Sequence, residues 1–289
     1  MPPFIGQSIT IIASSDSSTT PTTTIADSET DGGDESIKPL IQSSTIVSLA
    51  RLSFRQLFLL TMVPSITALL SAFILGFGWD YAELLNYDWT CGRVLLPSIS
   101  RIINLPKERV IFHLGMVLHG GIRPIFMAQS YLINSRVAKH SSQFTFVVKI
   151  AAILAFIAGL VELGFTFALT FVGERENGPL HCVFFIGFLI ACGASKLLGL
   201  FCCRFSQAHS VDSLVRFGLR VRVGLITTIA LLVPGILVCF VLYWQSCIRI
   251  AYEFFACLEY ITIITIYASH IATILELRHF ECHIIRKKR

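Results

Sequence analysis

The chain has 289 residues, of which 54% are hydrophobic and only 14% are charged, and its mean hydropathy is +0.72. The first 37 residues hold six of the 18 acidic residues and no lysine or arginine, so the remainder of the chain is strongly basic. This balance excludes a collagen, a small disulfide-rich secreted protein and a single soluble enzyme domain. It predicts a multi-span membrane protein with an acidic tail.

Residues 1–50 are predicted to form a disordered cytosolic tail. Eighteen of them are Ser or Thr, and such a segment cannot bury enough apolar surface to offset its chain entropy. The apolar run at residues 9–13 is too short and too mixed for the core of a cleavable signal peptide. We therefore expect the first true span to direct membrane insertion.

Six apolar runs after the tail are long enough to cross a bilayer as helices, which takes about 20 residues each. We predict from them an all-α polytopic membrane bundle of six transmembrane helices over residues 51–280, followed by a basic cytosolic C-terminus at 281–289. The runs are residues 57–79, 110–133, 150–172, 180–203, 223–244 and 247–277.

The basic residues between the runs predict the orientation, because basic flanks are retained in the cytosol. Thirteen lysines and arginines fall on the side that holds both chain ends, and about six fall on the other side, several of them next to acidic residues. Both termini are therefore predicted to be cytosolic. The connections at residues 80–109, 173–179 and 245–248 are expected to face a lumen or the exterior.

The last four residues, Arg286-Lys287-Lys288-Arg289, have two interpretations. They resemble a dibasic retrieval signal for the early secretory pathway. They also fit a basic cytosolic flank that contacts anionic lipid.

The nine cysteines contain no CxxC spacing, and no metal site is predicted. Cys91 and Cys247 both fall in segments assigned to the oxidising side of the membrane, where a disulfide bond between them would join the first long loop to the start of the sixth span. The alternative is two free thiols, and Cys182 lies near the same face as a competitor.

Ionisable residues within the spans are the strongest local signal, because a charge at mid-bilayer costs about 2.5–3.5 kcal/mol on insertion scales. His119 and Arg123 are four residues apart on one face of the second span, and Glu162 lies at mid-depth in the third span. In the sixth span, Glu259 and His270 are eleven residues apart and share one helical face.

This cluster has a structural and a functional interpretation. In the structural one, Arg123 pairs with Glu162 or Glu259 and holds the bundle together. In the functional one, Arg123 binds the phosphate or carboxylate of a lipid headgroup, and His119 acts as a general base oriented by Glu259 or Glu162. The sequence contains no GxSxG, zinc-triad or phosphate-loop motif, and no cofactor or nucleic-acid partner is predicted.

A series of short motifs runs from about Arg51 to Phe280. The motifs are Cys91-Gly92, Leu96-Pro97-Ser98-Ile99-Ser100, Leu105-Pro106, Leu118-His119 with Arg123, Val161-Glu162, Cys247, Leu258-Glu259-Tyr260 and His270. Each motif alone is weak, but in their order and spacing they resemble the post-GPI-attachment-to-proteins factor 2 family, which contains six-span membrane proteins of the DRAM and Sfk type.

The resemblance implies a Golgi and endoplasmic reticulum membrane protein that acts in lipid remodelling of GPI-anchored proteins. In that pathway a lyso-GPI intermediate regains a fatty acid before transport to the cell surface, so GPI-anchored proteins and lyso-GPI lipid are the expected partners. The resemblance leaves open whether the protein transfers the acyl chain itself. The alternatives are a non-enzymatic lipid or cargo chaperone in the same pathway and an unrelated transporter or membrane organiser. A transporter is expected to have broken helices at matching places in two halves, and Pro64 and Pro234 lie in spans without half-to-half similarity.

Overall fold

The computed structural model describes residues 8–15, 46–86, 91, 93–137, 145–206, 213–277 and 280–287. Six of its helices are long and apolar enough to cross a membrane, which confirms the predicted all-α bundle of six spans. Five of these helices extend beyond the apolar run predicted for them at one or both ends, because residues outside the run continue the helix, whereas α8 begins two residues after the start of its run. The six are α1 (Phe54–Gly78), α4 (Pro106–Val137), α5 (Thr145–Phe171), α6 (Glu174–Ser206), α7 (Ser213–Ser246) and α8 (Arg249–Leu277).

The spans pack most extensively as three pairs of consecutive helices, α1 with α4, α5 with α6, and α7 with α8. Phe54 and Met62 of α1 form a buried cluster with Phe126 of α4. Further along the same pair, a Cβ atom on Gly115 would lie 2.3 Å from the Ala68 Cβ atom. A glycine is therefore required for the close approach of these two helices.

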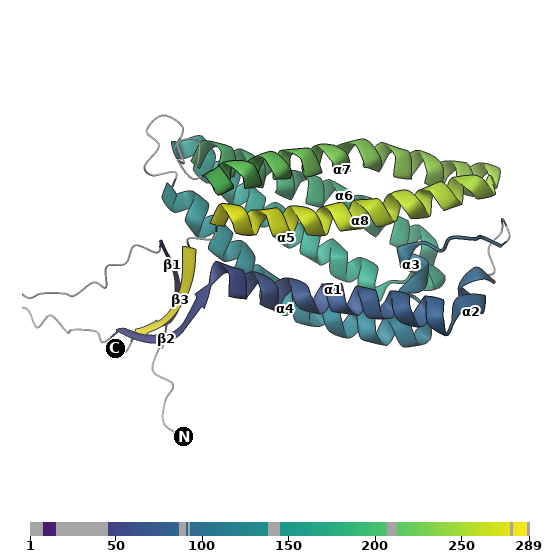
Figure 1. Ribbon diagram of the computed structural model, residues 1–289, viewed down its shortest axis with the longest axis horizontal. Coiled ribbons are helices and arrows are strands. Elements are labelled where there is room, and N and C mark those ends of the chain that lie inside the picture. The colour runs from purple at the N-terminus through teal and green to yellow at the C-terminus, as the bar shows by residue number, and fades with distance from the viewer. Residues whose placement is uncertain are drawn as a thin grey trace, which may run out of the picture.

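The predicted loop between the first two spans contains two short helices, α2 (Tyr81–Leu85) and α3 (Ile99–Ile102). They lie at the end of the bundle away from the chain termini, which we name the loop end (Figure 1). Sequence analysis predicted this connection but not its helices, because elements of four or five residues depend on contacts with the rest of the fold.

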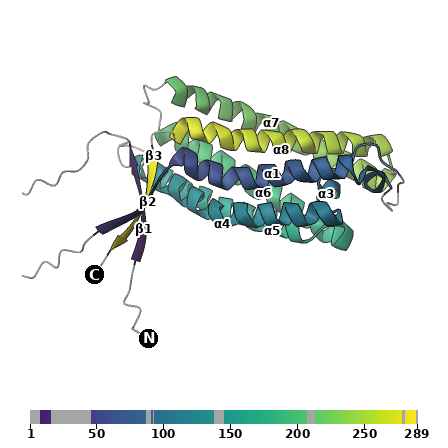
Figure 2. The ribbon, with the colours of Figure 1, turned by 60° about the horizontal axis from the view of Figure 1, so that its bottom comes forward.

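The other end of the bundle, named the terminal end, has a three-stranded sheet beside it (Figure 1, Figure 2). Its strands are β1 (Ser8–Ser15), β2 (Ile46–Ser53) and β3 (Phe280–Lys287), in the order β1-β3-β2 with antiparallel pairing. β2 continues directly into α1, where Ser53 and Gln56 form a capping box.

Sequence analysis predicted none of these strands, which lie in the segments assigned to the tail and to the basic C-terminus. Two strands lie within residues 1–53 and the third within the basic end of the chain. Isoleucine and valine in the strand segments favour extended structure. These runs are short, and the tail was assessed by its overall Ser and Thr content, so the strands were not predicted. The other residues of the predicted tail lie outside the described residues.

Candidate functional site

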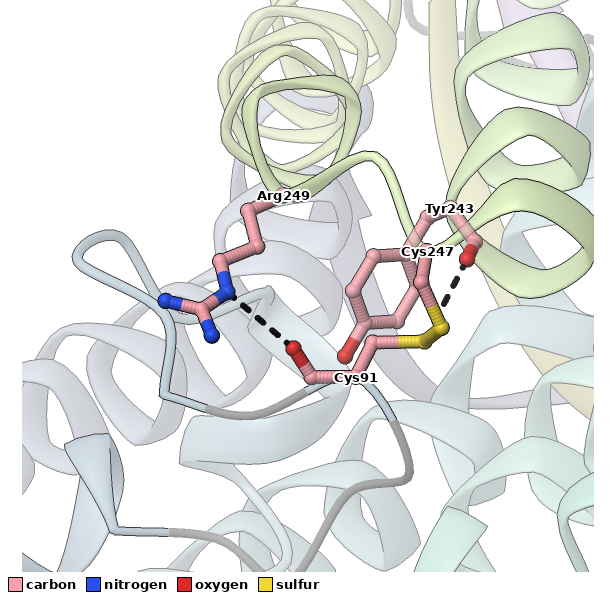
Figure 3. The surroundings of a disulfide bond; sticks show 4 residues. All are labelled: Cys91, Tyr243, Cys247 and Arg249. Carbon is pink, nitrogen blue, oxygen red and sulfur yellow. Dashed lines mark hydrogen bonds between the residues drawn. A yellow bond between two sulfur atoms is a disulfide. The ribbon is translucent and has the colours of Figure 1, made fainter.

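Residues 93–105 lie at the loop end of the bundle, and a disulfide bond just before them anchors the segment. This bond joins Cys91 to Cys247, whose Cα atoms are 5.1 Å apart, and it is the pairing that sequence analysis favoured over two free thiols. The guanidinium Nε of Arg249 donates a 3.2 Å hydrogen bond to the carbonyl oxygen of Cys91 (Figure 3). The competing cysteine, Cys182, is a free thiol.

Two carboxylates of α8 bind backbone N–H groups of this segment. Glu253 accepts hydrogen bonds from the N–H groups of Leu95 and Leu96, at 2.7 and 2.6 Å. Deeper in the bundle, Glu259 Oε2 accepts one from the Ile99 N–H at 2.8 Å. Unpaired N–H groups are costly away from water, so α8 fixes the position of α3.

Two tyrosines of α8 add to this attachment. The Tyr252 hydroxyl donates to Ser98 Oγ at 2.9 Å, and the Tyr260 hydroxyl donates to the Pro97 carbonyl oxygen. The guanidinium carbon of Arg101 lies 5.2 Å from the centre of the Tyr252 ring, a cation–π contact. The motif from Pro97 to Arg101 is thus held by side chains far away in the sequence.

Two cavities meet beside α3. The outer cavity has a volume of about 710 Å³ and lies among α3, α6, α7 and α8. The inner cavity, of about 140 Å³, continues towards the middle of the bundle. Both cavities are lined by Ser100, His181, Phe185 and Glu259, so these side chains stand at their junction.

The inner cavity brings together the ionisable residues selected from the sequence. They come from α4, α5 and α8, and all five line this one space: His119, Arg123, Glu162, Glu259 and His270. The spacing of four in α4 and of eleven in α8 placed both pairs on inward faces, as helical periodicity requires.

Arg123 and Glu162 form a buried ion pair, with Nη2 and Oε1 2.6 Å apart. Their side chains are only 7% and 2% exposed. Of the two partners considered for Arg123, Glu162 is therefore the one it contacts, and Glu259 binds the backbone of Ile99 instead. This geometry agrees with the ion-pair interpretation, and a headgroup-binding role for Arg123 stays a prediction.

His119 and His270 have different partners within the cavity. His119 Nδ1 lies 2.8 Å from the carbonyl oxygen of Thr61, so the ring is oriented by backbone rather than by Glu162 or Glu259. His270 Nε2 lies 3.2 Å from Nζ of Lys196 on α6. The general-base role of His119 and the assisting role of Glu259 remain predictions.

Sequence analysis did not select the polar pair at the cavity junction, Ser100 and His181. Ser100 Oγ and His181 Nε2 lie 3.1 Å apart, although the two residues are 81 positions apart in the sequence. Ser100 was quoted only as part of a motif, and no local spacing indicates a contact over that separation. Among the described residues, no group of His, Cys, Asp and Glu side chains could hold a metal ion.

Comparison with known proteins adds a family likeness to this geometry. The family model described as Frag1/DRAM/Sfk1/Cwh43P N-terminal domain matches residues 53–280, which include all six spans. A Drosophila melanogaster protein named Post-GPI attachment to proteins factor 2-like is 26% identical over 230 residues, covering 77% of this chain and 69% of the relative. No solved structure matches the chain significantly.

Proposed function

Because the chain belongs to the Frag1/DRAM/Sfk1/Cwh43P family, we propose that it is a GPI-anchor lipid remodelling factor of the Golgi and endoplasmic reticulum membranes. In this role it is needed to add a fatty acid back to lyso-GPI-anchored proteins before their stable transport to the cell surface. The name of the Drosophila relative supports a role in the maturation of GPI-anchored proteins.

The observation that carries the proposal is the outer cavity, which combines the two kinds of lining that a lysolipid needs. Its lining includes the polar side chains of Glu174, His181 and Tyr252 and the apolar side chains of Leu237 and Phe240 on α7. Ligand pockets commonly combine a mainly apolar lining with a few polar groups. An acyl chain fits the apolar side chains, and a glycerol hydroxyl fits the polar ones.

The predicted orientation supports the same role. With both termini in the cytosol, the loop end faces the lumen, where the headgroups of GPI anchors lie. A disulfide bond at that end fits an oxidising lumen, because disulfides persist in the secretory pathway and are rare in the cytosol. The cavities then open on the side of the membrane that holds the substrate.

The test uses cells that lack this protein and express a GPI-anchored reporter. Surface retention and the lipid composition of the reporter's anchor are measured after rescue with wild type or His119→Ala at matched abundance. We expect wild type to restore a second saturated chain and surface retention. Unchanged anchors and surface levels after loss of the protein would contradict the proposed function, whereas equal rescue by His119→Ala would remove only the predicted role of His119.

A further inference from the structure

Ser100 and His181 form a hydroxyl–imidazole pair whose hydrogen positions follow from its neighbours. His181 Nδ1 lies 2.7 Å from the carbonyl oxygen of Val172, and Nε2 lies 3.1 Å from Ser100 Oγ. A carbonyl oxygen only accepts hydrogen bonds, so Nδ1 carries the hydrogen and Nε2 presents its lone pair to the serine hydroxyl. A base oriented by a third group and placed against a hydroxyl is the arrangement of an activated serine nucleophile.

Two hydrogen bonds hold the backbone around Ser100. Asn104 Nδ2 donates a 2.6 Å hydrogen bond to the Ser100 carbonyl oxygen, and Glu259 binds the N–H of Ile99 at 2.8 Å. Asn104 is itself close to Gly173, where an added Cβ atom would lie 2.2 Å from the Asn104 side-chain oxygen. Gly173 therefore lets the turn between α5 and α6 approach α3 closely.

His181 is positioned by a break near the start of α6. Asn177 has φ −155° and ψ 86°, outside the helical region, and its side-chain oxygen accepts a hydrogen bond from the Leu180 N–H at 3.0 Å. Asn177 thus acts as an N-cap, and Pro179 falls in the first turn, where its missing N–H costs nothing. The main part of α6 therefore starts after this break. Its first turn carries His181, whose ring contacts the Val172 carbonyl oxygen.

The other histidines with described side chains lack such a contact. His113 Nε2 lies 2.6 Å from a backbone carbonyl oxygen, His119 binds another carbonyl oxygen, and His270 contacts a lysine. Within this group, His181 is the histidine whose ring joins a backbone carbonyl to a side-chain hydroxyl. His113 lies in the same half of the bundle and serves below as its matched control.

An ester in the bilayer can reach this pair through the outer cavity. On α6 and α7 the cavity is lined by Ile186, Leu237 and Trp244, which are 46%, 37% and 41% exposed on the membrane-facing surface of the bundle. His181, in contrast, is 6% exposed. Acyl chains can therefore enter between apolar side chains while the base is kept from bulk water, which limits hydrolysis of a reactive intermediate.

We propose that Ser100 is an acyl-accepting nucleophile and His181 its general base, so that the protein itself transfers a fatty-acyl chain from a membrane phospholipid ester to a hydroxyl of the lyso-GPI lipid. This inference rests on the proposed function and extends it, because a remodelling factor need not be an enzyme.

The transfer occurs in two balanced steps. Ser100 Oγ attacks the ester carbonyl carbon of the phospholipid while His181 Nε2 takes the serine proton. The bond from that carbon to the glycerol oxygen breaks, and the leaving oxygen receives the proton from His181. In the second step a hydroxyl of the lysolipid gives its proton to His181 and attacks the acyl-serine ester. The Ser100 ester bond breaks, Ser100 Oγ regains the proton, and the enzyme returns to its starting state.

The first experiment treats the purified full-length protein in nanodiscs with a fluorophosphonate that carries a long alkyl chain. We expect one covalent adduct, which peptide mass spectrometry locates at Ser100. The adduct should be absent from Ser100→Ala, and in His181→Gln it should form at least about 100-fold more slowly. Ser130→Ala and His113→Gln are the matched controls and should react at the wild-type rate. Absence of an adduct at Ser100 in folded wild type would overturn the proposal.

A second variant separates chemistry from folding. Ser100→Cys keeps a nucleophile at this position, and in nanodiscs of phosphatidylcholine it should accumulate an acyl thioester that neutral hydroxylamine releases. In the cell assay described above, Ser100→Ala and His181→Gln should fail to restore the second acyl chain at wild-type abundance, whereas both controls restore it. If Ser100→Ala restores it equally, the nucleophile is wrong and the remodelling role stands. If wild type itself changes no anchor, the remodelling role fails while a Ser100 adduct would still show a reactive serine.

Discussion

Arg123 and Glu162 place opposite charges in the interior of the bundle, where each charge depends on the other. Their atoms approach to 2.6 Å, and both side chains are almost fully buried. Removing one partner leaves the other charge buried and uncompensated, which costs about 3–5 kcal/mol. We therefore predict that Glu162→Gln lowers the unfolding midpoint of the purified protein strongly, as measured by thermal unfolding in detergent.

Two comparisons test whether burial is the cause. The exposed pair of Lys107 and Asp80 has a similar geometry at 3.0 Å, but the lysine side chain is 66% exposed, so Lys107→Ala should change the midpoint little. Replacing both buried charges, by Arg123→Leu with Glu162→Leu, should recover much of the stability lost in the single variant. A single variant as stable as wild type would show that the pair does not hold the bundle together.

Among the elements, the crossing of α1 and α4 depends on one glycine. A Cβ atom at Gly115 would lie 2.3 Å from the Ala68 Cβ atom and 2.7 Å from the Pro64 carbonyl oxygen, and that backbone cannot move aside without separating the helices. Gly115→Ala should therefore destabilise the protein by about 1–3 kcal/mol, as overpacking does. In the same helix, a Cβ atom added at Gly121 would have no neighbour within 4 Å, so Gly121→Ala should be neutral or stabilising. Equal effects of the two substitutions, compared by thermal unfolding, would contradict this account.

The elements that sequence analysis found are those set by local composition. A transmembrane helix must be long and apolar to satisfy its backbone in lipid, and all six spans were predicted for that reason. The two short helices at the loop end have no such requirement. α3, for example, is fixed by the Glu259 carboxylate from the far end of the chain. The strand at residues 280–287 likewise forms through partners at the N-terminal end.

At the scale of the whole molecule, the site likewise combines residues that the local sequence indicates with residues that only the fold brings together. Charges inside spans are costly, so Arg123, Glu162 and Glu259 could be selected from the sequence, and they line one cavity. Ser100 and His181 carry no such signal, because Ser100 is an uncharged residue in a predicted connection and His181 is only the second residue of its predicted span, far from mid-bilayer. Their contact depends on how α3 and the start of α6 are placed by the rest of the bundle. The buried charged residues could therefore be predicted from the local sequence, whereas the catalytic pair that we propose is formed only by the fold.

The orientation of the whole protein can be tested at two connections on opposite ends of the bundle. Asp88→Thr turns Asn86-Tyr87-Asp88 into an acceptor for N-glycosylation in the connection at the loop end, and His140→Asn creates an acceptor ahead of Ser141-Ser142 in the connection between α4 and α5. Because the acceptors are modified only in the lumen, we expect Asp88→Thr to gain a glycan and His140→Asn to stay unmodified, as read from gel mobility before and after glycosidase treatment. The reverse pattern would place the loop end in the cytosol. The Cys91–Cys247 bond would then lie in a reducing compartment, and the cavities would open away from the GPI headgroups.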